Sequence, residues 1–144
     1  MSALRQRLAG WRQDPRLPGR LLAGLMFIAA VLVFWMGRGA TFSGDEIRLV
    51  VATPGLDPQT VFEPHGGHLM AIGRLAYWPI LELSGFDYRP FRLLALITLL
   101  VMVGLFFLWA RRRTDPWLAL AICALLLFFG ADPMHMFQGN GFIV

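Results

Sequence analysis

Residues 93–110, with the sequence LLALITLLVMVGLFFLWA, decide the fold class because none of these eighteen residues is charged. As a helix, a run of this length is about as long as the hydrocarbon core of a bilayer is thick. We therefore predict a transmembrane helix over about 91–110.

Two more apolar stretches flank this one. Residues 117–131 read WLALAICALLLFFGA, and the six-residue link 111–116 predicts two antiparallel neighbouring helices. Residues 21–37 read LLAGLMFIAAVLVFWMG and also carry no charge. A cleaved signal peptide is the competing interpretation of 21–37, but its basic leader is long and Arg38 interrupts the small-residue pattern before Ala40. An uncleaved signal anchor is therefore favoured, and it gives three predicted transmembrane helices.

The composition excludes several other classes of protein. Hydrophobic residues make up 57% of the 144-residue chain and charged residues only 15%. Such a chain is too apolar for a disordered segment or a soluble enzyme domain. Its single cysteine, Cys123, cannot build a disulfide scaffold. The chain is predicted to be an all-α integral membrane protein, and the apolar residues 142–144 look like the start of a fourth apolar segment.

The basic residues predict the orientation. All thirteen are arginines; five lie in the segment 1–20 and three form the run 111–113. Arginines flanking apolar spans are typical of cytoplasmic loops, whereas nucleic-acid binding is not expected from this distribution. We expect a basic cytoplasmic segment 1–20 and a membrane domain 21–144 with an external loop 38–90. The protein would then be a multi-pass protein of the cell (inner) membrane.

Within the external loop, 66–83 is predicted to be an amphipathic helix. Its apolar residues recur at helical spacing: Leu69, Ile72, Ala76, Ile80 and Leu83. Arg74 lies off this apolar face, and Pro79 is expected to kink or divide the helix. The helix would lie on the membrane surface with Tyr77 and Trp78 at the interface, or pack against the transmembrane helices.

Asp45 and Glu46, just after the first apolar stretch, are the candidate catalytic residues. Two adjacent carboxylates that are partly desolvated near a membrane raise each other's pKa, which suits a general base. The alternative interpretation is a solvated pair in a loop.

Glu63, His65 and His68 form a second candidate group. The two histidines lie three positions apart where a helix is expected to begin, so they could share a face and bind a divalent metal such as zinc together with Glu63. The free amides of such a helix start could equally hold a phosphate. The alternative is a tight helix start with hydrogen-bonding histidines.

Arg89 and Arg92 precede the second span in the sequence DYRPFRLL. Arginine is suited to bidentate phosphate contacts, and Arg92 at the membrane edge could reach a lipid phosphate. The alternative is anchoring at the interface, with Asp87 as a partner.

The order of these features resembles the start of the GT-C membrane glycosyltransferases, in particular the protein O-mannosyltransferase and aminoarabinose transferase branch. In that branch a DE pair is followed by a histidine or lysine with PPL and then by G-x-x-x-x-x-R-L. Here the corresponding stretches are 45–46, 63–69 (EPHGGHL) and 85–93 (GFDYRPFRL). The resemblance covers the chain from about Leu21 onward and only the beginning of a typical family member. The sequence PHGGHL replaces the double-proline motif, and no proline follows Arg92-Leu93.

The resemblance implies a donor sugar carried on a polyprenyl phosphate. Asp45, with Glu46 as runner-up, would deprotonate an acceptor hydroxyl, which would attack the anomeric carbon with inversion and expel the lipid phosphate. Arg74 and Arg92 would bind the phosphate, with His65 and His68 as further candidates. Further helices of a longer chain or a partner subunit would complete the site. The alternative function is a small non-enzymatic membrane protein that binds or scaffolds a partner through its external loop.

Overall fold

A computed structural model describes residues 14–42, 44–51, 55, 57–65, 68–69 and 71–129. The side chains of Asp45, His65, His68 and Leu69 are outside this description. Most of the basic segment 1–20 and the apolar start at 142–144 also lie outside the described residues.

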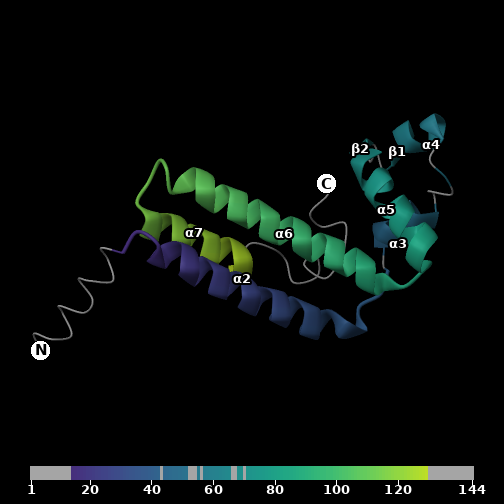
Figure 1. Cartoon of the computed structure of the whole chain (residues 1–144). Helices are drawn as coiled ribbons and strands as arrows, with labels where there is room; N and C mark the ends of the chain where they lie inside the picture. Colours follow the sequence, from purple (N-terminus) through teal and green to yellow (C-terminus); the bar gives the residue numbers. More distant parts are fainter. Residues whose placement is uncertain are drawn as a thin grey trace, which may run out of the picture. The chain divides into compact units, whose positions relative to one another are not determined.

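The described chain is almost entirely helical, as predicted (Figure 1). Its helices are α2 (Leu17–Met36), the 3₁₀ turn η1 (Gly37–Gly39), α3 (Gly44–Val51), α4 (Pro58–Phe62), α5 (Ala71–Ser84), α6 (Tyr88–Ala110) and α7 (Pro116–Phe129). Two strands of two residues each, β1 (Pro64–His65) and β2 (His68–Leu69), pair antiparallel.

Two helical stretches in the described part of the chain are long and apolar enough to cross a membrane. They are Leu17–Gly39 and Tyr88–Ala110, each of 23 residues, with mean hydropathies of 2.1 and 2.7. The helix predicted over 117–131 is present as α7, but α7 has only 14 residues. Its length is about 21 Å at the usual helical rise, well short of a hydrocarbon core of about 30 Å. The third predicted span is therefore not confirmed, because α7 is shorter than a helix that could cross a membrane.

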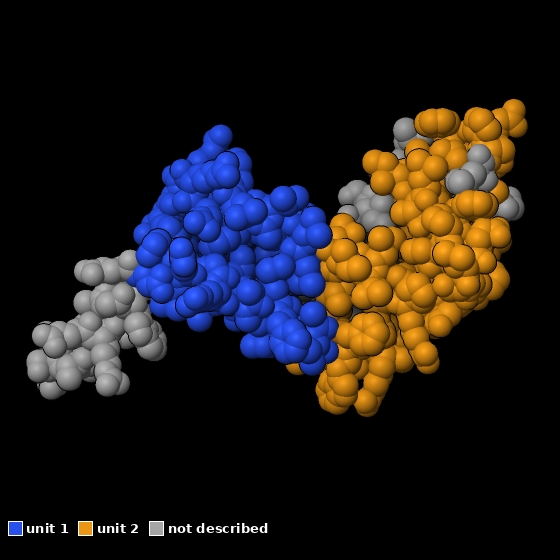
Figure 2. Space-filling model, in the orientation of Figure 1, with its two compact units in different colours: residues 1–31, 100–130 blue, residues 32–99, 131–144 orange. Residues whose placement is uncertain are grey.

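The chain divides into two compact units (Figure 2). Unit 1 comprises Met1–Val31 and Leu100–Gly130, and unit 2 comprises Leu32–Leu99 and Ala131–Val144. In unit 1, α7 packs on the second half of α6, where the Cys123 thiol lies 3.8 Å from the carbonyl oxygen of Val103 and both residues are buried. Asp115 caps α7 by accepting hydrogen bonds from the amides of Trp117 and Leu118, and Pro116 follows it at the first helical position.

In unit 2, α3 and α4 pack against α5. The core consists of Leu49, Val50, Tyr77, Tyr88 and Phe91, from α3, α5 and the start of α6. The ring of Phe42 packs edge-on against the rings of Tyr88 and Phe91, at centroid distances of 4.9 and 5.0 Å. Aromatic pairs in this geometry add stability beyond that of their buried area. The start of α6 thus belongs to the core of unit 2.

The turn between α5 and α6 explains how Tyr88 reaches this core. Gly85 has φ +58°, a left-handed conformation that favours glycine, and its amide bonds back to the carbonyl oxygen of Leu81. Asp87 then accepts a hydrogen bond from the Arg89 amide at the start of α6. Only three residues, Gly85, Phe86 and Asp87, therefore connect α5 to α6.

The predicted helix over 66–83 was wrong at its start, and the face that it buries is not the predicted apolar face. The helix begins at Ala71, after the β1–β2 pair, and it continues across Pro79 without dividing. Ile72 and Leu83, on the predicted apolar face, are 78% and 88% exposed. The residues that α5 buries are Gly73, Arg74 and Tyr77. Periodicity missed this face because its central residues are a glycine, an arginine and a tyrosine rather than aliphatic side chains.

Candidate functional site

Glu46 lies at the centre of unit 2. Glu46 is 0% exposed. Its Oε1 atom accepts hydrogen bonds from the hydroxyl of Tyr77 at 3.3 Å and from the hydroxyl of Tyr88 at 3.4 Å. We call these three residues the Glu46 cluster. Gly44, which begins α3 with φ +52°, allows the chain to turn into the helix just before this carboxylate. The interpretation of a solvated loop pair is therefore excluded for Glu46; Asp45 adjoins it in α3, and its side chain is not described.

The electrostatics of the Glu46 cluster hold Tyr77 in its protonated form. Burial raises the pKa of Tyr77, and the nearby charge of Glu46 raises it further. A phenol that keeps its proton remains a hydrogen-bond donor, which is what a buried carboxylate needs. Tyr77 is buried in the core, so the predicted position of Tyr77 at the membrane interface was wrong.

Arg74 lies three positions before Tyr77 in α5 and is only 1% exposed. Neither its Nε nor its Nη1 has a hydrogen-bond partner in the part of the chain that the structure describes. A buried guanidinium with unmet donors is costly, because each unsatisfied polar atom carries its desolvation penalty. Arg74 is therefore the described residue of unit 2 that would gain most from an anionic ligand.

Arg92, in the first turns of α6, is 5% exposed and is already partly engaged. Its Nη1 donates a hydrogen bond to the carbonyl oxygen of Gly37, and its guanidinium lies 4.4 Å from the centroid of the Phe34 ring. Its Nε has no partner among the described residues. Arg92 thus joins α6 to the end of α2, where the last carbonyl groups of a helix favour a cation. Arg89 is exposed, and the Asp87 carboxylate accepts from its backbone amide.

The two histidines were predicted to lie at the start of a helix, and this prediction was wrong. His65 and His68 are Cα partners in the β1–β2 pair. Two adjacent glycines between two short strands are a hairpin signal, and Pro64 is tolerated at the first position of a strand. Among the side chains that the structure describes, no group of three or more His, Cys, Asp or Glu could hold a metal ion.

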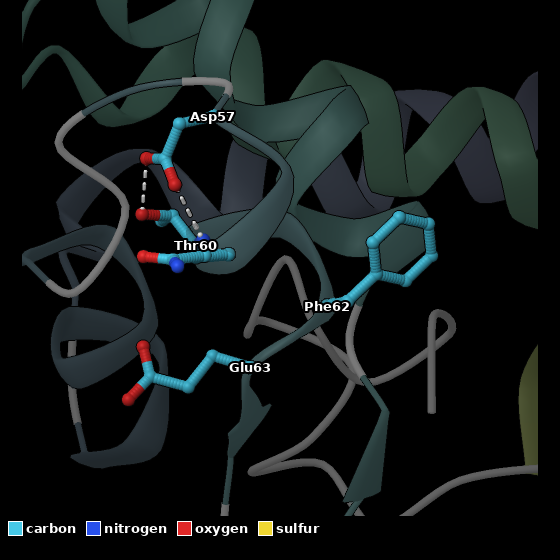
Figure 3. Close-up of a pocket in the computed structure, with 5 residues that line it drawn as sticks. Asp57, Thr60, Phe62 and Glu63 are labelled. Carbon is cyan, nitrogen blue, oxygen red and sulfur yellow. Dashed lines mark hydrogen bonds between the residues drawn. The ribbon is translucent and has the colours of Figure 1, made fainter.

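Glu63, the other candidate metal ligand, lines an open hollow with Asp57, Gln59, Thr60 and Phe62 (Figure 3). Asp57 caps α4: its carboxylate accepts hydrogen bonds from the amide and the hydroxyl of Thr60, and these bonds lower the pKa of Asp57. The ring of Phe62 points away from the polar side chains in Figure 3. The hollow is thus the exposed surface of a capped helical turn, and it brings none of the other candidate site residues together.

No protein-family model matches the chain, and no curated protein or solved structure matches it either.

Sequence reasoning missed the two tyrosines as partners of Glu46. They are the only tyrosines in the chain, and both lie in the 50 residues that follow the DE pair. A buried carboxylate needs donors, and tyrosine is an aromatic residue that can be buried and still donate. If Glu46 is taken to be buried, this requirement predicts the two tyrosines as its hydrogen-bond donors.

Proposed function

We propose that this chain is a multi-pass membrane protein that forms the N-terminal part of a glycosyltransferase using a sugar on a polyprenyl phosphate. One observation carries the proposal: α3, which holds the Asp45-Glu46 pair, is fixed through Glu46 in the same unit as two buried arginines. Inverting transfer from a lipid phosphate needs a general base and cations that meet the phosphate charge. Unit 2 contains residues of both kinds, in the order that the GT-C resemblance implies.

The division of roles within the acidic pair follows from the burial of Glu46. A carboxylate that is 0% exposed and bonded to two phenols is suited to hold α3 in place. We therefore assign Asp45 as the general base and Glu46 as a positioning residue. Asp45 would take the proton of an acceptor hydroxyl, whose oxygen then bonds to the anomeric carbon as the bond to the phosphate oxygen breaks.

Arg74 and Arg92 are the proposed phosphate-binding residues. The Nε and Nη1 atoms of Arg74 and the Nε atom of Arg92 are donors without a partner in the described chain. Phosphate oxygens would satisfy these donors with charge-assisted hydrogen bonds. His65 and His68 remain candidates for the same phosphate, or for a divalent metal with Glu63.

The proposed topology has three spans with the N-terminus in the cytoplasm. α2 and α6 are the first two spans, and α7 with the residues that follow it is the third. Arginines 111–113 would then lie on the cytoplasmic side of the cell (inner) membrane, and α3, α4 and α5 on the other side.

The experiment is a transfer assay on the natural full-length protein in membranes, with polyprenyl-phosphate sugars as donors. Asp45→Asn should abolish transfer, whereas Glu82→Gln, which neutralises an exposed acid on α5, should leave the rate unchanged. Transfer by Asp45→Asn at the wild-type rate would contradict the assignment of the base. Absence of transfer from every donor would contradict the enzymatic proposal itself.

A second candidate function is partner binding by the external loop without catalysis. One observation favours it: Phe62, Ile72, Leu83 and Phe86 of unit 2 are each more than 60% exposed. We propose that these side chains contact a partner or a bilayer, which would require them to form one contiguous apolar surface. Replacing Ile72 and Leu83 by serine should then weaken partner capture while leaving any sugar transfer intact.

A further inference from the structure

A mostly apolar groove of about 420 Å³ lies in unit 1, between the first turns of α2 and the second half of α6. Gly19 and Leu22 line it from α2, and a stripe of α6 side chains from Val101 to Arg111 lines it from the other side. The groove exists because two of its lining residues, Gly19 and Gly104, have no side chain to fill it.

The two glycines mark where the helices come close. A Cβ atom at Gly19 would lie 3.9 Å from Cε1 of Phe107, and one at Gly104 would lie 3.9 Å from Cε of Met26. These are ordinary van der Waals distances, so a methyl group fits at either position. A longer side chain at Gly104 would occupy the groove.

The open side of the groove is apolar and exposed. Val101, Leu105 and Leu108 on α6 are 54%, 62% and 51% exposed. Residues 101–111 extend over about 15 Å of helix, along which an extended hydrocarbon chain can lie.

One end of the groove is strongly basic. Arg111 lines it. The start of α2 and the link between α6 and α7 carry four more described arginines: Arg16, Arg20, Arg112 and Arg113. The acids in these segments are Asp14 and Asp115, and both carboxylates accept hydrogen bonds from backbone amides. Five guanidinium groups against two carboxylates leave an excess of positive charge at this end.

We propose that the groove binds one anionic phospholipid of the bilayer, with an acyl chain along α6 and the phosphate at Arg111 and Arg20. The shape fits a hydrocarbon chain, and the charge at one end fits an anionic headgroup. The site rests on the membrane insertion proposed above but is independent of sugar transfer. It lies in unit 1, whereas the candidate catalytic residues lie in unit 2.

The test uses the full chain, purified in mild detergent, with phosphatidylglycerol and phosphatidylcholine of identical acyl chains as probes. Native mass spectrometry should show one phosphatidylglycerol retained per chain, in preference to phosphatidylcholine. Arg111→Gln should weaken its retention about fivefold, the effect of one arginine charge near an anionic surface. Gly104→Leu should abolish retention by filling the groove.

Two matched variants serve as controls. Arg113→Gln removes an equal charge from a residue that stacks on Trp109 and does not line the groove. Gly24→Leu adds an equal side chain to α2 at a position with open surroundings. Gly24→Leu should retain phosphatidylglycerol like the wild type, and Arg113→Gln should weaken its retention less than Arg111→Gln does.

Equal retention of the two lipids, or equal weakening by Arg111→Gln and Arg113→Gln, would overturn the site. Cross-linking from Leu105 to another protein helix seated in the groove would overturn it as well. Because Arg111 is exposed, its variant tests the proposal even if Gly104→Leu fails to fold. Alkaline extraction separates the two proposals: a chain that stays in the membrane but retains no phosphatidylglycerol contradicts the lipid site alone.

Discussion

The hydroxyl of Tyr77 in α5 donates a hydrogen bond to the carboxylate of Glu46 in α3, 31 positions earlier in the chain. Tyr88 donates to the same oxygen from the start of α6. One buried carboxylate thus connects three helices, α3, α5 and α6. The stability of unit 2 is expected to depend on both donors.

Tyr77→Phe is expected to lower the free energy of unfolding by about 1–3 kcal/mol, because the buried carboxylate loses a donor and gains nothing in exchange. Tyr88→Phe should act in the same direction. Thermal unfolding in detergent, followed by circular dichroism, measures both. The control is Tyr77→Phe in a Glu46→Leu background, where the phenol has no carboxylate to meet and the loss should be much smaller. An equal loss in both backgrounds would show that the hydrogen bond contributes nothing.

The ionisation of Tyr77 gives a prediction about alkaline pH. Burial, together with the charge of Glu46, raises the pKa of Tyr77 above its ordinary value of 10.0. Because the folded-state pKa is the higher one, the contribution of Tyr77 to stability is fully present below about pH 10. It is lost as the pH rises from there toward the folded-state pKa.

The measurement is a spectrophotometric titration of phenolate absorbance, which is simple because the chain has only two tyrosines. In the folded protein at least one tyrosine should stay protonated well above pH 10, and both should ionise near pH 10 after denaturation. Tyr77→Phe should remove this late component. Normal ionisation of both tyrosines in the folded protein would contradict the burial of the Glu46 cluster.

Local periodicity predicted the helices, but it could not predict which face of α5 is buried. The uncharged runs in α2 and α6 are sufficient to predict helices, because length and apolarity are local properties. Tyr77 is buried because of Glu46 and Phe91, and pairings over such distances leave no trace in the local spacing of residues. In α5 the aliphatic residues Ile72 and Leu83 produced a regular pattern that belongs to the exposed side.

The hairpin was predictable in part. Gly66-Gly67 between two possible two-residue strands is a turn signal, but His65 and His68 also fit the three-residue spacing of a helix. Single positions in so short a segment satisfy both patterns, so only the observed pairing of their Cα atoms separates them. The buried state of Arg74 was not predictable, because arginine is rarely buried and nothing nearby in the sequence requires it.

Arg92→Met is expected to destabilise the protein by about 1.5–3 kcal/mol, because a charged donor bonds the carbonyl oxygen of Gly37 and the guanidinium stacks on Phe34. Arg92→Lys should recover only part of the loss, since an ammonium group lacks the planar face that stacks on a ring. Arg89→Met is the matched control: Arg89 lies three positions earlier in α6, is exposed, and should change stability by less than about 0.5 kcal/mol. Equal effects of Arg92→Met and Arg89→Met would contradict the structural role of Arg92.

The last prediction concerns the number of spans and uses the fact that Cys123 is the only cysteine. In a Cys123→Ser background, single cysteines at Glu82, Thr114 and Gln138 are labelled with a membrane-impermeant maleimide in intact cells. The proposed topology places Glu82 outside and Thr114 inside, so Glu82→Cys should react and Thr114→Cys should react only after the membrane is opened. If α7 and the residues after it complete a third span, Gln138→Cys should react like Glu82→Cys. Labelling of Gln138→Cys only after opening would mean that the chain returns to the cytoplasmic side, and the third span would have to be abandoned while the first two remain.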